Sequence, residues 1–256
     1  MIKFKHSFKT NSQAGQDLFV CNITSNKENG YYVEVGSAYP KNGSNTYLLE
    51  ETLNWKGISL EINNSFVSLF RESRINPCLE VDATIFGFKE YFVENNFPKQ
   101  IDYLQIDIHP PFANLCVLEN LPLDLYRFST ITFEHDLYAK PENKIVKQKA
   151  EEILFKYGYK RIVNNLRIVS PSKGSSDKWE PFEDWWVDTS VYPQFNFQDT
   201  IDDPRWVDLF NFNQKFKFCV YLGVLKIRLK KSEDKPILSF FIKCYRHIVR
   251  IIRLKN

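Results

Sequence analysis

The sequence lacks the features that would tie the chain to a membrane, a zinc ion or an oxidising compartment. It has no uninterrupted run of 18 apolar residues, so no segment is expected to span a membrane. The first twelve residues are basic and polar, without the apolar stretch of a signal peptide. The five cysteines are scattered and include no Cys-x-x-Cys pair, which disfavours a disulfide framework or a zinc site. These absences predict a cytoplasmic protein, and they indicate no metal.

Charge is distributed unevenly along the 256 residues. Residues 226–256 carry ten Lys and Arg against two acids, a net charge of +8, while the other 225 residues carry −5. Because phosphate binding needs basic side chains near the site, nucleic acid is not an expected partner of this acidic body. The 43% hydrophobic and 25% charged content is typical of a globular protein, and the length suffices for one α/β domain with an appendage.

The stretch 30–46 has the pattern of a strand, a glycine turn and the start of a helix. Tyr31 to Val35 is a short β-rich run that ends at Gly36, and a helix is predicted over 47–53. In a nucleotide-binding βαβ unit, such a glycine lets the backbone approach the ligand, and the helix N-terminus offers free N–H groups. The alternative is an ordinary glycine turn of an α/β protein that binds no nucleotide.

Glycines are scarce in the loop that follows. Ser37 and Ala38 stand where a dinucleotide fingerprint has more glycine, and Glu34 precedes the turn. An acid and no pyrophosphate cradle suit a nucleoside with a short cationic tail, such as S-adenosylmethionine (SAM), better than NAD. The second predicted strand, Ile58 to Glu61, ends on a carboxylate about 25 residues past Gly36, which is where an acid can bind the ribose hydroxyls.

The residues up to this point resemble the FkbM-type methyltransferases. The resemblance is carried by Gly30 to Gly36, Ser44-Asn45-Thr46, Leu49-Glu50, Trp55-Lys56-Gly57-Ile58 and Leu60-Glu61, and it extends over about residues 13–188. That family uses SAM and commonly methylates hydroxyls of sugars and natural products. The resemblance implies a Rossmann-like class I methyltransferase fold: an α/β protein with a mostly parallel seven-stranded sheet and helices on both faces.

The resemblance and the general methyltransferase pattern imply a set of cofactor-binding residues. A Gly-Gln-Asp stretch like that at Gln16 precedes the first strand in the family, and the alternative is that it merely caps a helix. Asp82, after the third strand, occupies the place of the side chain that reads adenine, and the alternative is a turn residue. The full set is Gln16, Glu34, Gly36, Ser37, Ser44, Asn45, Thr46, Glu61, Asp82, Ala83 and Asp107.

The fourth and fifth predicted strands, 101–107 and 127–133, end in polar side chains where ligands bind to open α/β sheets. Asp107 and His109 follow the fourth, and Glu134-His135-Asp136 follow the fifth in a segment that also resembles the family. Deprotonating a hydroxyl suits a histidine oriented by a carboxylate, so His135 is the first candidate base and His109 the second, with Asp107 beside them. A structural histidine is the alternative.

Other residues at this edge are assigned to the acceptor. Glu134, Asp136 and Trp185 are predicted to contact it, with Pro110 shaping the floor of its pocket, although aromatic residues such as Trp185 also fill cores. A magnesium site built from Asp107, Glu134 and Asp136 is an alternative, because Mg²⁺ prefers oxygen ligands. His109-Pro110-Pro111-Phe112 superficially resembles the loop of amino-methylating nucleic-acid enzymes, the runner-up function.

The chain is thus divided into a cap segment (1–29), a SAM-binding domain (30–188), an aromatic-rich extension (189–235) and a basic amphipathic helix (236–256). Residues 159–164 and 166–169 are predicted to form a hairpin, 170–177 a loop and 216–220 a short strand. The terminal helix either lies on an anionic membrane or packs on protein. The predicted function is O-methylation of a sugar or another small molecule, and the remaining alternative is a non-catalytic module docked at a membrane.

Overall fold

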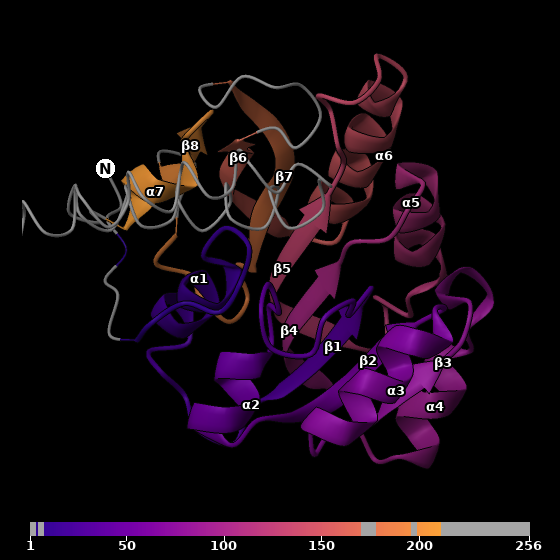
Figure 1. Cartoon of the computed structure of the whole chain (residues 1–256). Helices are drawn as coiled ribbons and strands as arrows, with labels where there is room; N and C mark the ends of the chain where they lie inside the picture. Colours follow the sequence, from indigo (N-terminus) through magenta and orange to yellow (C-terminus); the bar gives the residue numbers. More distant parts are fainter. Residues whose placement is uncertain (1–3, 5–7, 170–177, 196–198, 211–256) are drawn as a thin grey trace, which may run out of the picture. The chain divides into compact units, whose positions relative to one another are not determined.

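The computed structural model of the chain describes residue 4 and residues 8–169, 178–195 and 199–210. The loop predicted over 170–177, the strand over 216–220 and the basic helix over 236–256 lie outside these residues. The described elements, in chain order (Figure 1), are α1 (Gln16–Ile23), β1 (Tyr31–Val35), α2 (Tyr47–Leu53), β2 (Lys56–Glu61), α3 (Asn64–Ser73), β3 (Cys78–Glu80), the 3₁₀-helix η1 (Ala83–Ile85), α4 (Phe88–Glu94), β4 (Gln100–Ile106), α5 (Pro111–Asn120), β5 (Arg127–Glu134), α6 (Asn143–Lys156), β6 (Tyr159–Val169), β7 (Trp179–Asp188), β8 (Ile201–Asp202) and α7 (Trp206–Leu209).

These strands form one sheet in the order β3-β2-β1-β4-β5-β7-β6-β8. The first five strands of the chain are parallel to one another, and β7 is antiparallel to both of its neighbours, β5 and β6. The prediction of a mostly parallel Rossmann-like sheet is therefore confirmed, with the two-residue β8 as an eighth strand at the edge. Parallel strands bring their carboxyl ends to one edge, which is where the predicted site residues lie.

The two faces of the sheet differ in character because alternate residues of a strand point to opposite sides. One face is apolar and packs against α4, α5 and α6, with Val33, Leu104 and Ile131 in its core. The other face carries polar side chains such as Glu34 and lies against α1 and α2. The predicted helices on both faces are confirmed. The face that carries polar side chains is unusual, because helices cover it and it is still not apolar.

The hairpin predicted within residues 159–169 is wrong. β6 is one strand of eleven residues that pairs with β7 along its length, with register shifts around residues 161–167. Asn165 takes a positive φ of 57° and its N–H donates to Asp184 at 2.6 Å. The asparagines that suggested a turn therefore form a bulge in a continuous strand.

The sheet continues past the domain end predicted at Asp188. Within the described residues, β8 pairs with β6, and α7 buries Trp206, Val207 and Leu209. The backbone N–H of Phe4 donates to Leu209 at 3.2 Å, and the rings of Phe4 and Phe210 lie 5.5 Å apart. Residues near both ends of the described chain therefore pack together beside β7. The sequence did not predict α4, β8 or α7.

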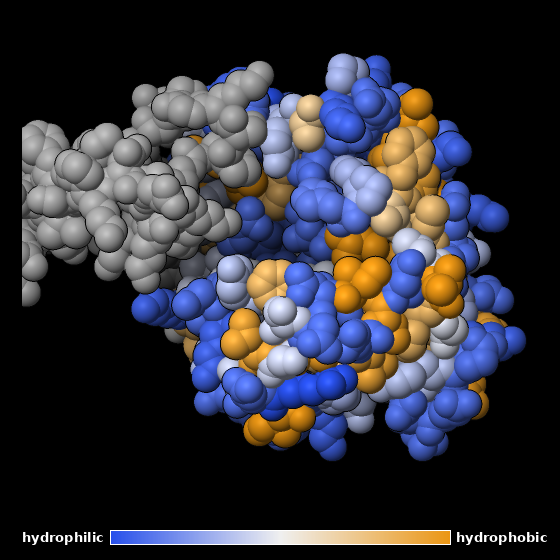
Figure 2. Space-filling view, turned by 45° about the vertical axis from the view of Figure 1, so that its right-hand side comes forward, coloured by the Kyte–Doolittle hydropathy of each residue, from blue (hydrophilic) through white to orange (hydrophobic). Residues whose placement is uncertain are grey.

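Hydrophobic side chains also reach the surface. Figure 2 shows orange hydrophobic patches separated by hydrophilic residues on the face in view. Ile75 and Ile85 are the most exposed of the large hydrophobic residues, at 92% and 83%. A search of the described helices finds none that is long and apolar enough to cross a membrane.

An ion pair between Arg74 and Glu50 joins the end of α3 to α2. The two side chains are buried, and Arg74 donates to one carboxylate oxygen of Glu50 through Nη2 at 2.7 Å and Nε at 3.0 Å. The guanidinium also donates to the carbonyl of Pro40 at 2.8 Å and to the hydroxyls of Ser44 and Thr46. Arg74 therefore fixes the middle of the loop between β1 and α2 and the end of the loop that leads into α2.

Replacing Arg74 by methionine is expected to destabilise the fold strongly. The Arg74→Met variant leaves the Glu50 carboxylate buried without its cation, which costs about 3–5 kcal/mol in comparable pairs. Urea denaturation followed by circular dichroism measures the loss. Arg71→Met, on the exposed side of the same helix, is the matched control and should lose less than about 1 kcal/mol. Equal stability of the two variants would contradict the role given to Arg74.

Candidate functional site at the carboxyl edge of the sheet

The turn after β1 admits only glycine. Gly36 has a positive φ of 86°, and a Cβ atom built on it would lie 1.9 Å from the carbonyl oxygen of Asp107. The N–H of Asp107 donates to Val35 at 2.9 Å, so the ends of β1 and β4 are in direct contact. The predicted glycine turn is present, and it brings Asp107 beside the loop.

Glu61 joins this loop to the end of β2. One carboxylate oxygen accepts from the N–H of Ala38 at 3.0 Å and the other from the N–H of Asn63 at 2.9 Å. Each oxygen has a second lone pair, so the carboxylate can still accept hydroxyl donors. Its contact with a ribose stays a prediction.

Several predicted cofactor residues are buried and bonded to protein atoms. Glu34 accepts from the hydroxyl of Ser59 at 2.6 Å, and burial raises its pKa to about 7. The Ser44 hydroxyl accepts from the N–H groups of Thr46 and Tyr47, and the Ser37 hydroxyl contacts the thiol of Cys78. These side chains hold the loop in shape, and direct contact of Glu34 and Ser44 with the cofactor stays a prediction.

The carboxamide oxygen of Asn45 differs from its neighbours. It is buried and has no hydrogen-bond partner among the described residues. A buried acceptor without a donor costs about 1–3 kcal/mol, so such an atom calls for a donor from a ligand or a water molecule. Asn45 therefore keeps its place among the candidate cofactor residues.

Asp82, Ala83 and Gln16 lie at the ends of other elements. Asp82 is exposed and caps η1, where its carboxylate accepts from the N–H of Thr84 at 2.9 Å, and hydrogen bonds from Thr84 lower its pKa. Ala83 is buried beside it. Gln16 is also buried, and its carbonyl oxygen accepts from Ala14 at 2.8 Å. The turn role that the sequence left open for Asp82 is thus observed, while its contact with adenine stays a prediction.

Three carboxyl groups meet where β4, β5 and β7 run side by side. Burial raises the pKa values of Asp107 and Glu134, whose side chains hydrogen bond to each other. Burial also raises the pKa of Glu183 to about 8, and the nearby charge of Asp107 acts in the same direction. Glu183 was not predicted, although its position two residues before Trp185 in an alternating strand would have placed it on the same face.

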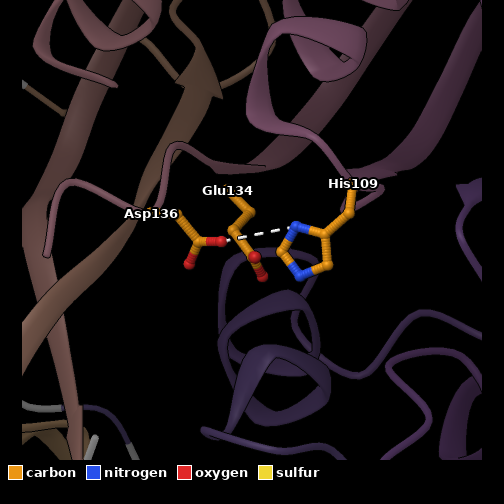
Figure 3. A group of neighbouring side chains, drawn as sticks. All are labelled: His109, Glu134 and Asp136. Atoms are coloured by element: carbon orange, nitrogen blue, oxygen red, sulfur yellow. Dashed lines mark ion pairs between the residues drawn. The ribbon is translucent and has the colours of Figure 1, made fainter. Parts of the chain in front are cut away.

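His109 and Asp136 lie beside Glu134 at the mouth of this group. The Nδ1 atom of His109 is 3.5 Å from a carboxylate oxygen of Asp136, and the His109 side chain is 71% exposed whereas that of Asp136 is 5% exposed. Figure 3 shows the three side chains pointing toward one another, from the loop after β4, the end of β5 and the loop after β5. We call His109, Glu134 and Asp136 the edge cluster. It combines two buried carboxylates with one histidine that faces outward.

His135 is not part of the edge cluster, and the prediction that it is the catalytic base is wrong. Its side chain is fully buried on the opposite side of the chain from Glu134 and Asp136. Nδ1 accepts from the N–H of Leu137 at 3.2 Å, and Nε2 lies 3.4 Å from Asp184. Both ring nitrogens are therefore engaged within the protein. His109, the second candidate, is the histidine that reaches the edge.

Trp185 is not exposed at this edge either. Its side chain is fully buried, and its ring stacks on Phe19 with centroids 4.6 Å apart. The alternative, that the aromatic residues of β7 fill the core, is the one observed. Pro110 is exposed next to His109, so its proximity to an acceptor stays a prediction.

Comparison with known proteins gives a likeness of fold only. No family model and no curated protein sequence matches the chain. An O-methyltransferase from Bacillus cereus, solved with SAH, is 15% identical to this chain, with a TM-score of 0.45. The match covers 71% of this chain and 84% of the O-methyltransferase. Aeropyrum pernix fibrillarin, solved with SAM, is 14% identical, with a TM-score of 0.44, over 69% of this chain and 74% of the fibrillarin. An N-methyltransferase from Bradyrhizobium japonicum is 9% identical, with a TM-score of 0.44, over 68% of this chain and 94% of the N-methyltransferase.

The raised pKa of Glu183 predicts a pH-dependent contribution to stability. Between the ordinary pKa of a glutamate and about 8, the folded chain holds a proton that the unfolded chain has released, so stability decreases as pH rises. Glu183→Gln, which stays neutral, should flatten this decrease and should be relatively more stable at pH 9 than at pH 5. Urea denaturation of both proteins across this range measures the difference. Parallel stability profiles would contradict the assignment.

Proposed function

We propose that the chain is a SAM-dependent methyltransferase that methylates an oxygen atom of a sugar or another small-molecule hydroxyl. The observation that carries the proposal is that the glycine-only turn after β1 and the edge cluster lie at the same edge of the sheet. The turn can accommodate a nucleoside, and the edge cluster can act on an acceptor beside it.

The residues around the turn fit SAM. Gly36 leaves backbone space that a side chain would fill, and Glu61 presents oxygens that can accept from ribose hydroxyls. Asn45 has a buried oxygen without a donor. When bound, SAM supplies a methyl group on a positively charged sulfur. The acidic groups at this edge, Asp107 among them, favour a cationic ligand over the phosphates of a dinucleotide.

The acceptor is expected to be uncharged. Glu134 and Asp136 make this edge acidic, and neither pairs with a Lys or Arg in the part of the chain that the structure describes. An acceptor that carries phosphates would be repelled, which argues against nucleic acid. The FkbM-type resemblance of the sequence supports a sugar or natural-product hydroxyl within this class.

The residues of the chain contribute positioning and removal of a proton. The loop that Arg74 fixes would hold the cofactor, and the edge cluster would hold the acceptor oxygen in line with the methyl group. A hydroxyl must lose its proton as it is methylated, and His109 is the exposed member of the cluster that borders the incoming oxygen.

Loss of the Glu61 carboxylate is expected to weaken SAM binding. Glu61→Ala removes an acceptor of charged hydrogen bonds, each of which contributes about 1.5–3 kcal/mol, so affinity should decrease roughly 10- to 150-fold. Isothermal titration calorimetry measures it. Glu80→Ala, at the end of the neighbouring strand β3, is the control and should bind SAM like the native chain. Unchanged affinity in a folded Glu61→Ala variant would contradict the assignment.

Removing the imidazole of His109 is expected to lower turnover by about 10²–10⁴ and to leave SAM affinity nearly unchanged. Transfer of the radiolabelled methyl group of SAM to a panel of monosaccharides and uncharged glycosides measures it. Glu119→Gln, an exposed change on α5, is the control. SAM binding without transfer to any hydroxyl in the panel would instead favour the non-catalytic module.

A further inference from the structure

We propose that the edge cluster binds a divalent metal ion. One atom each from His109, Glu134 and Asp136 can be chosen so that all three lie within 4.8 Å of one another. Ligand atoms on opposite sides of an ion with bonds of about 2.1 Å are about 4.2 Å apart, so small side-chain rotations bring the three into coordinating distance. The ligands come from the carboxyl ends of the paired strands β4 and β5 and the residues that follow them (Figure 3).

The burial of the carboxylates is a second and independent observation. Glu134 is 6% exposed and Asp136 is 4% exposed, and in the described ranges of the chain no Lys or Arg forms an ion pair with either. The side chain of Glu134 has the Asp107 carboxyl as its partner, and Asp136 contacts His109 and the hydroxyl of Tyr138. Buried carboxylates are normally paired with cations, bound to metals or neutralised by a proton. Glu134 and Asp107 can share a proton, whereas the Asp136 carboxylate has only His109 and a hydroxyl as partners among the described residues, so a metal ion would supply the positive charge at Asp136.

The donor set indicates which ion fits. One imidazole nitrogen with two carboxylates suits a first-row ion such as Mn²⁺ better than Mg²⁺ or Ca²⁺, which prefer oxygen ligands alone. The two carboxylates enclose the site from the protein side, whereas the His109 side is open to solvent. Three protein ligands leave positions at which an acceptor oxygen can bind.

The role of the ion rests on the proposed function, although its binding does not. A hydroxyl bound to the ion has a lowered pKa and loses its proton to solvent more readily. The oxygen then forms a bond to the methyl carbon as the carbon–sulfur bond breaks. The electron pair of that bond stays on sulfur, which becomes a neutral thioether. With the ion bound, His109 serves as a ligand that fixes the ion, and this role replaces the removal of the proton that the proposed function assigns to His109.

Titration of the full chain with Mn²⁺, followed by the loss of the free-ion signal in electron paramagnetic resonance, tests the site. We expect one ion per chain, and at least a tenfold lower affinity in Glu134→Gln and Asp136→Asn, which keep the shape of the side chains. Glu119→Gln should bind like the native chain. No binding at millimolar Mn²⁺, or equal affinity in all variants, would overturn the proposal.

The exposed His109 provides a variant whose folding is not at risk. In the native chain, electron spin echo modulation of bound Mn²⁺ should show coupling to the imidazole nitrogen, and His109→Ala should abolish it. Persistence of that coupling would remove His109 from the ligand set and overturn the site as proposed. Calorimetry with SAM on the same samples separates the two proposals. Ion binding without SAM binding refutes only the methyltransferase function. SAM binding without ion binding refutes only the metal site.

Discussion

The loop that would bind the cofactor depends on the buried ion pair between Arg74 and Glu50. Arg74 binds the loop at Pro40, in its middle, and at Thr46, where it leads into α2. The second oxygen of Glu50 accepts from the N–H groups of Ile75 and Asn76. One pair of charges thus joins α2, the loop and the segment that leads into β3. Because the pair is buried, removal of either partner leaves an uncompensated charge, and residues 40–46 of the loop would lose their support.

A second constraint is the alternation of side chains at the end of β5. Glu134 and Asp136 point into the edge cluster, while His135 points into a network with Asp184, to which Lys147 also donates. Two polar groups of different character therefore lie around the end of β5. The acidic group can bind ligands because it is open at His109, whereas the group around His135 is closed and structural.

Much of the fold follows from local sequence. The strand over 31–35 and the helix over 47–53 have the predicted bounds, because a β-rich run, a glycine and a helix-opening segment each act over a few residues. The edge at which Glu61, Asp107 and Glu134 gather was also predictable, since parallel strands end together. The bulge at Asn165 was not, because an asparagine with positive φ serves equally in a turn and in a strand.

The sequence by itself determined the strand–turn–helix order, the glycine turn and the acidic residues that end the strands. Only the tertiary structure decided that Trp185 lies in the core, that His109 rather than His135 reaches the edge, and that Arg74 is paired with Glu50. The first set depends on neighbours along the chain. The second depends on which residues distant in sequence come into contact, and on which side of the sheet each one points.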